Sequence, residues 1–283
     1  MPTIEISEFT DPGCPWAFSA EPARRRLDWV YGDQLAWTPV MIGLAESGED
    51  YESKGFTADV LSGALKEIGA DHGMPIDSAL RPRMAGTVPA CRSVVAARLH
   101  APTAMRALLR SLRVRCFAGA LLDDPDTLAA AAEDAGLDPA QLAEWAAGDD
   151  VAAALKDDMD RARHPHPAAL ALDHKLADWS GGRRYTAPSY ELTLDGSPDS
   201  TVVAAGFQPL LAYEVLIANL APGLERRDTT DDVAEVLAWA GEPLATKEVA
   251  AICELSVPDA RELLARAAVE HPVGADGYWS LAA

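Results

Sequence analysis

The stretch FTDPGCPW, residues 9–16, joins a segment with the apolar alternation of a strand to a segment with the apolar spacing of a helix. Residues 3–9 predict the strand, and an Asp-Pro-Gly turn follows it. Pro15 suits the first position of a helix, where its missing N–H costs nothing, and the helical spacing continues to about Tyr31. A second strand is predicted over residues 34–44. The chain therefore opens as strand, short loop, helix and strand.

Cys14 is the residue of this stretch best suited to chemistry. A cysteine at a helix N-terminus faces unpaired backbone N–H groups and the positive end of the helix dipole, and both stabilise the thiolate. The position predicts a lowered pKa of the Cys14 thiol and a nucleophile that attacks a disulfide or an electrophilic carbon. The alternative is a buried, inert cysteine that only begins the helix. Trp16 either forms an aromatic wall of the site or fills the core.

The middle of the chain, residues 57–179, is rich in alanine and leucine and has almost no strand-like runs. Asp124 and Asp138 precede prolines and predict helix N-caps. We expect about six helices here, followed by one more that reaches about Trp179. This region is predicted to be a helical insertion.

Strand signals return over residues 184–194 and 201–207, with an Asp-Gly hairpin signal between them. Residues 209–220 then have helical spacing. Together with the opening elements, these segments predict an α/β fold that is interrupted by a large all-helical insertion.

The last part of the chain, residues 229–283, follows a linker candidate at residues 221–230. Three helical segments and a C-terminal hairpin, in that order, predict a small winged-helix-like domain. Residues 231–283 contain ten acidic and three basic residues, a net charge of 3 − 10 = −7. A duplex-binding helix needs a positive surface, so we expect a packing, lid or dimerisation module here and no DNA binding.

The pattern Phe-x-Asp-Pro-x-Cys-Pro-Trp after a first strand resembles the DsbA-like thioredoxin-fold family. This family includes bacterial thiol-disulfide oxidoreductases, 2-hydroxychromene-2-carboxylate isomerases and kappa-class glutathione transferases. The resemblance implies a thioredoxin-like fold split by a helical insertion. With the organisation above it gives three domains: a discontinuous thioredoxin-like domain at residues 1–56 and 180–222, an insertion at 57–179 and the C-terminal domain at 229–283.

The resemblance also implies a cis-proline beside the active cysteine. Ala187-Pro188 stands where the family has this element, and the residue before the proline offers its backbone to the bound thiol or disulfide. A trans proline that begins a strand is the alternative. The expected site is therefore catalytic Cys14 with a set of neighbours that comes from both halves of the fold: Pro15, Trp16, Ala17, Ala187 and Pro188.

Ala17 departs from the pattern of the oxidoreductases, which carry a second cysteine at that position. A dithiol enzyme uses its second sulfur to break the mixed disulfide and release the product. In this chain an external thiol must break the mixed disulfide instead. Three hypotheses follow: a monothiol oxidoreductase or isomerase, a transferase or isomerase that depends on a low-molecular-weight thiol, and a binding protein that has lost catalysis. In each case no bound cofactor is expected, and a small thiol is the candidate co-substrate.

Other polar residues give weaker signals. Cys91 lies early in a helix of the insertion and is an alternative resolving cysteine, although free cysteines are more often core residues. His164 and His166 lack a carboxylate or cysteine nearby that would complete a metal site, so no metal is expected. The run at residues 24–26 is all arginine and could steer an anionic thiol, but a solvated helix face is the favoured interpretation.

The composition sets the limits on partners. The 283 residues are 49% hydrophobic and carry a net charge of −20, which disfavours nucleic acid and anionic membrane surfaces as partners. Four scattered cysteines make no disulfide framework. The N-terminus has neither the basic nor the apolar segment of a signal peptide, so a cytoplasmic protein is expected, with a thiol or disulfide substrate. A homodimer stays open.

Overall fold

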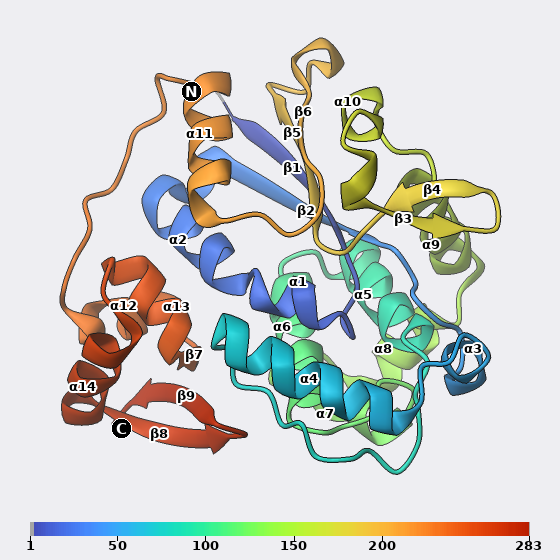
Figure 1. Ribbon diagram of the computed structural model, residues 1–283, viewed down its shortest axis with the longest axis horizontal. Coiled ribbons are helices and arrows are strands. Elements are labelled where there is room, and N and C mark those ends of the chain that lie inside the picture. The colour runs from blue at the N-terminus through green and yellow to red at the C-terminus, as the bar shows by residue number, and fades with distance from the viewer. Residues whose placement is uncertain (1–2, 283) are drawn as a thin grey trace.

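The computed structural model describes residues 3–282 and contains a mixed four-stranded sheet (Figure 1). Its strands are β1 (Ile4–Thr10), β2 (Leu35–Met41), β5 (Ser189–Leu194) and β6 (Val202–Ala204). They lie in the order β2-β1-β5-β6, with β1 parallel to β2 and antiparallel to β5. The sheet therefore joins the N-terminal segment to a segment that follows the helical insertion, as predicted.

The helix predicted from Pro15 to about Tyr31 is two helices, α1 (Pro15–Ser19) and α2 (Glu21–Tyr31), so that prediction was wrong in its middle. Pro22 has no backbone N–H to donate to the carbonyl four residues earlier, which ends the first helix. Because of this break, the two helices pack into different hydrophobic cores. Phe18 of α1 packs on Phe117 of the insertion, whereas Leu27 of α2 packs under the sheet.

The insertion is helical as predicted. A short helix, α3 (Gly48–Glu52), precedes the predicted bounds of the insertion. The helices within those bounds are α4 (Ala58–His72), α5 (Val88–His100), α6 (Met105–Phe117), α7 (Pro125–Asp134), α8 (Pro139–Ala146), α9 (Asp149–Ala162) and α10 (Pro167–Leu170). The predicted caps are confirmed, because the Asp124 carboxylate accepts from the N–H of Asp126 and the Asp138 carboxylate accepts from the N–H of Gln141. No helix within residues 3–282 is long and apolar enough to cross a bilayer.

The helix predicted to reach Trp179 is a strand instead. Leu176–Trp179 forms β3, which pairs antiparallel with β4 (Gly182–Tyr185) in a separate two-stranded ribbon. Gly182 has a φ of 131°, a value that favours glycine and closes the tight turn between the two strands. The strand predicted over residues 184–194 is therefore divided into β4 and β5 by the segment that contains Ala187 and Pro188.

The C-terminal unit contains three helices and a three-stranded sheet of order β7-β9-β8. Its elements are α12 (Val233–Ala240), β7 (Leu244–Ala245), α13 (Thr246–Cys253), α14 (Val257–Ala267), β8 (Ala268–Val273) and β9 (Asp276–Leu281). The predicted three helices and hairpin are present, while the winged-helix assignment stays a prediction. Figure 1 shows this unit beside α2 and α4, and α13 packs directly against α2.

This packing corrects the interpretation of Arg24, Arg25 and Arg26 as a solvated face. All three side chains are buried, at 7%, 2% and 3% exposure. Arg24 pairs with Glu8 at 2.6 Å, and Arg26 donates to the carbonyl oxygen of Ile252 at 2.7 Å. Helix α2 lies between the sheet and the C-terminal unit, so its polar face is covered by acidic and carbonyl groups rather than by water.

Candidate active site

Cys14 begins α1 directly after the turn that follows β1, as predicted. It occupies the N-cap position, and its N–H donates to the carbonyl oxygen of Asp11 at 3.2 Å. The side chain is only 6% exposed, and its Sγ donates to the carbonyl oxygen of Ala187 at 3.2 Å. The Ala187–Pro188 peptide bond is cis. The fold thus brings together the two parts of the expected site.

The electrostatic setting of Cys14 differs from the prediction of a lowered pKa. Burial raises the pKa of Cys14 to about 11, and the negative charge of Asp11 also raises it. The backbone N–H groups of Ala17 and Trp16 lower this pKa, as does the charge of Arg113, but burial outweighs them. The effect of the helix N-terminus is therefore present without being decisive, and at neutral pH the group is a thiol.

The remaining neighbours divide into buried and exposed groups. Pro15 occupies the first turn of α1, and Ala17 is 2% exposed and packs in the same apolar cluster as Cys14. Trp16 is 42% exposed, so it does not fill the core. Its ring meets those of His72 and Phe207 edge-on, at centroid distances of 5.0 and 5.7 Å. These aromatic side chains come from three separate parts of the chain and form a partly exposed wall.

Asp11, which the sequence indicates only as part of a turn, is a further candidate for a functional role. Its side chain is fully buried and accepts from the N–H groups of Gly13 and Leu44 at 2.8 and 3.0 Å. It also accepts from the Thr87 hydroxyl at 2.8 Å and the Cys91 thiol at 3.4 Å. Burial raises the pKa of Asp11 against the effect of these donors. Asp11 therefore connects the loop of residues 11–14, which carries Cys14, to α5.

The other three cysteines are free thiols. Cys91 is fully buried, and burial raises its pKa well above the ordinary value. Burial also raises the pKa of Cys116 to about 12 and that of Cys253 to about 11. Cys91 donates to Asp11 rather than to Cys14, which is consistent with a packing role. Cys253 lies in the core shared by α2 and the C-terminal unit.

Two further residues near Cys14 had no signal in the sequence. Tyr51 of α3 is half-buried, and burial and then the charges of Asp11 and Cys14 raise its pKa. Arg184 of β4 is also half-buried, and burial lowers its pKa while the charges of Cys14 and Asp11 raise it. The charge of Cys14 therefore acts on the pKa of both side chains. They come from α3 and from the separate ribbon of β3 and β4, so no local pattern could have indicated them.

His164 and His166 serve local roles. The Nδ1 atom of His164 lies 2.7 Å from the carbonyl oxygen of Asp160, and that of His166 accepts from the N–H of Ala168 at the start of α10. Among residues 3–282 no group of three or more histidine, cysteine or acidic side chains is arranged to hold a metal ion.

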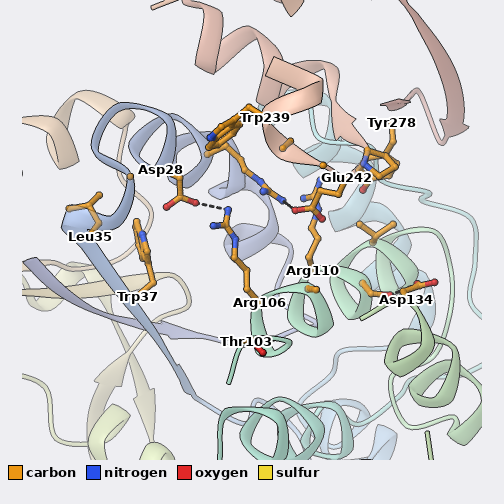
Figure 2. A pocket seen from close by; sticks show the side chains of 18 of the residues that line it. Asp28, Leu35, Trp37, Thr103, Arg106, Arg110, Asp134, Trp239, Glu242 and Tyr278 are labelled. Atoms are coloured by element: carbon orange, nitrogen blue, oxygen red, sulfur yellow. Dashed lines mark hydrogen bonds and ion pairs between the residues drawn. The ribbon is translucent and has the colours of Figure 1, made fainter. Parts of the chain in front are cut away.

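A separate cleft of about 1090 Å³ lies between α2, α6 and the C-terminal unit (Figure 2). Trp37, Trp239 and Tyr278 are among the residues that line it. The Arg106 side chain in this cleft points to Asp28, with which it pairs at 2.5 Å. None of the four cysteines, all within the described residues, lines the cleft. This cleft therefore lies at the junction of α2, α6 and the C-terminal unit, and Cys14 is not part of it.

The fold and this site define a thioredoxin-like protein with one cysteine at the start of its first helix. The sequence matches the family of the DSBA-like thioredoxin domain over residues 5–166, more than half of the chain, and the chain belongs to this family. The family resemblance of the FTDPGCPW stretch is thereby confirmed. No curated protein matches the chain in sequence.

Solved structures with the same fold are distant in sequence. A "putative protein disulfide isomerase" from Nitrosomonas europaea has a TM-score of 0.60 at 16% identity, covering 78% of this chain and 98% of its own. A probable DsbA oxidoreductase from Streptomyces coelicolor has a TM-score of 0.53 at 17% identity, covering 81% and 94%. The cytosolic disulfide reductase DsbM from Pseudomonas aeruginosa has a TM-score of 0.52 at 17% identity, covering 77% and 100%. These similarities support the fold.

Proposed function

We propose that the protein is a monothiol thiol-disulfide oxidoreductase in which Cys14 is the nucleophile. The observation that carries this proposal is the position of Cys14 at the N-terminus of α1, with its Sγ 3.2 Å from the carbonyl oxygen of Ala187. Ala17 stands where a resolving cysteine would be, so the chemistry depends on one sulfur. Membership of the DSBA-like family supports this class of reaction.

The reaction has two exchange steps. The Cys14 thiol first gives up its proton to the solvent, and the thiolate so formed attacks one sulfur of a disulfide R–S–S–R. The Cys14–S–S–R bond forms, and RS⁻ leaves and takes up a proton. A second thiolate, R′S⁻, then attacks the R sulfur of this mixed disulfide. The bond to Cys14 breaks, R–S–S–R′ is released, and Cys14 regains its proton. The sum converts R–S–S–R and R′SH into RSH and R–S–S–R′, with no other oxidant or reductant.

The environment of Cys14 favours the reducing direction. Strongly oxidising members of this fold gain their power because the thiolate of the reduced form is stabilised. Burial instead raises the pKa of Cys14 to about 11, so the reduced form gains no such stabilisation at neutral pH. We therefore propose reduction of disulfides, with a low-molecular-weight thiol as the second thiol and no bound cofactor.

Mass spectrometry tests the proposal. The wild-type protein is incubated with hydroxyethyl disulfide, and we expect one adduct that peptide mapping places at Cys14. Cys14→Ser abolishes this adduct, and the matched control Cys253→Ser retains it. Absence of any adduct at Cys14 up to pH 10 would contradict the proposal. Equal binding of a small thiol by the wild type and Cys14→Ser, without an adduct, would support a transferase instead.

Ala17→Cys provides a gain-of-function test. The new thiol one helical turn from Cys14 attacks the mixed disulfide, so the adduct disappears and an internal disulfide with two fewer hydrogens forms. Persistence of the adduct in Ala17→Cys would show that the two positions cannot react, against the proposed geometry. We further propose a reducing, cytoplasmic setting for the protein, and partners that are thiols or disulfides rather than nucleic acid or membrane.

A further inference from the structure

The cleft between α2, α6 and the C-terminal unit has the size and the lining of a small-molecule site. Its volume of about 1090 Å³ is close to the upper end of the range for ligand pockets, about 1,000 Å³. Figure 2 shows the Arg106 side chain extending from α6 toward Asp28, with Trp37 of β2 and Trp239 of α12 on two other sides of the cleft. Aromatic walls with a few charged groups are typical of sites for organic ligands.

Arg106 has unused hydrogen-bonding capacity in this cleft. Its side chain is 41% exposed, and its recorded partner within residues 3–282 is Asp28, whose Oδ2 lies 2.5 Å from Nη2. A guanidinium has five N–H groups, so those on Nε and Nη1 are left for a ligand. Burial lowers the pKa of Arg106, and so do the charges of Arg24 and Arg25. The opposing charge of Asp28 does not outweigh them, so a further anion would stabilise the charged guanidinium.

The wall of the cleft contains buried donors without acceptors. Tyr278 and Arg110 are 4% and 5% exposed, and the Arg110 guanidinium lies over the Tyr278 ring, 5.4 Å from its centroid. Within the described residues no hydrogen-bond partner is recorded for the Tyr278 hydroxyl, the Nη1 of Arg110 or the Nε1 of Trp37. Buried polar groups are rarely left unpaired in folded proteins, so these atoms indicate a missing partner, either a ligand or ordered water. The wall is short of acceptors.

The acidic side chains that line the cleft leave room for an anion. Three of the four are paired with arginines: Asp28 with Arg106, Asp134 with Arg115 at 2.8 Å and Glu242 with Arg25 at 2.7 Å. The fourth, Asp33, is exposed in the short helical turn η1 (Gly32–Gln34). The charges of the paired carboxylates are largely compensated, so the free donors of Arg106 determine the kind of ligand.

We propose that this cleft is a second binding site, separate from Cys14, for a small aromatic carboxylate. Arg106 donates to the carboxylate, and Trp37 and Trp239 contact the ring. Bonds between a guanidinium and a carboxylate are charge-assisted and match in planar geometry, so they distinguish an anion from a neutral ligand of the same shape. Contacts between aromatic rings add apolar burial. Because α12 and β9 form part of the wall, the C-terminal unit takes part in binding.

Isothermal titration calorimetry on the full chain tests this site with three ligands of similar size that differ in charge: cinnamate (anionic), cinnamyl alcohol (neutral) and cinnamylamine (cationic). We expect the wild type to bind cinnamate about ten-fold or more tightly than the alcohol, and the amine most weakly. Equal affinity for all three would overturn the proposal. No binding of cinnamate up to about 1 mM would also overturn it and would leave water as the partner of the buried donors.

Arg106→Gln tests the residue that donates to the carboxylate. We expect it to lower the affinity for cinnamate to that for cinnamyl alcohol and to leave the affinity for the alcohol nearly unchanged. The matched control is Arg83→Gln, at an arginine that is 50% exposed, pairs with Asp123 at 2.7 Å and lies outside the cleft. It is expected to keep the wild-type preference. A preference that survives in Arg106→Gln would contradict the proposal, and the comparison of ligands on the wild type stays decisive if this variant does not fold.

Two tryptophan variants locate the ligand. Trp239→Leu, in the cleft, is expected to weaken the binding of cinnamate and of cinnamyl alcohol alike, because the ring contacts do not depend on charge. Trp16→Leu, in the aromatic wall beside Cys14, is expected to leave both affinities unchanged. Binding that is lost in Trp16→Leu and kept in Trp239→Leu would place the ligand at the active site and overturn the proposal.

Discussion

At the scale of single residues, the charge of the Asp11 carboxylate adds to the effect of burial on Cys14. Its charge is one of the causes that raise the pKa of Cys14. Asp11→Asn removes the charge and keeps one acceptor oxygen of two, so that it retains either the bond from Gly13, which runs to Oδ1, or the bond from Leu44, which runs to Oδ2. We therefore expect a lower pKa of Cys14, measured as a shift of the alkylation midpoint with iodoacetamide to lower pH. An unchanged or higher midpoint would contradict this electrostatic role, and Asp134→Asn, at an exposed carboxylate, is the control.

The residues that could be predicted are those whose role depends on local sequence. Cys14 was found because the strand, turn and proline around it define a helix N-terminus whatever the rest of the chain does. The direction in which the pKa of Cys14 shifts could not be predicted, because the burial of Cys14 depends on residues of the insertion and of the β3–β4 ribbon that pack around it. A sequence shows charges but not which charges meet.

At the scale of elements, the loop of residues 11–14, between β1 and α1, fits closely against the start of α5. A Cβ atom on Gly13 would lie 2.6 Å from the Cγ2 of Thr87, whose hydroxyl donates to Asp11. Gly13→Ala therefore forces Thr87 to move, and we expect a loss of about 1–3 kcal/mol of unfolding free energy together with a slower reaction at Cys14. Urea denaturation and the alkylation rate measure the two effects.

The companion substitution Thr87→Ser makes this prediction specific. It removes the methyl group that would clash and retains the hydroxyl that donates to Asp11. The double variant Gly13→Ala/Thr87→Ser is expected to recover most of the lost stability and rate. If the double variant is no better than Gly13→Ala alone, contact between the loop and α5 is not the cause.

Elements were predictable where their boundaries are set by their own residues. The caps at Asp124 and Asp138 and the strands β1 and β2 follow from local patterns. The ribbon of β3 and β4 was missed because a strand of four residues has too short a pattern to distinguish from a helix end. Its pairing, rather than its composition, makes it a strand.

At the scale of the whole molecule, buried ion pairs connect the sheet, the insertion and the C-terminal unit. Arg113 of α6 is 1% exposed and pairs with Glu8 of β1 and with Glu21 of α2. Arg110, one turn earlier, pairs with Glu248 of α13 at 2.6 Å. These contacts, together with the Trp29–Trp239 contact at 5.2 Å, explain why the C-terminal unit shares a core with α2. The net charge of −20 gives no indication of this arrangement.

Glu248 is the residue on which this connection can be tested. It is fully buried, and its carboxylate accepts from Arg110 and from the N–H of Ala245. Glu248→Gln removes the nearer carboxylate partner of the buried Arg110 and leaves it only Glu21 at 3.8 Å, so we expect a loss of about 3 kcal/mol of unfolding free energy. Glu262→Gln, at an exposed pair, is the matched control and is expected to change nothing measurable. The C-terminal unit shares its core with α2, so tryptophan fluorescence and circular dichroism of Glu248→Gln should report one unfolding transition, at a lower urea concentration than in the wild type. A separate early transition of the C-terminal unit alone would show that the ion pairs do not couple this unit to the rest of the protein.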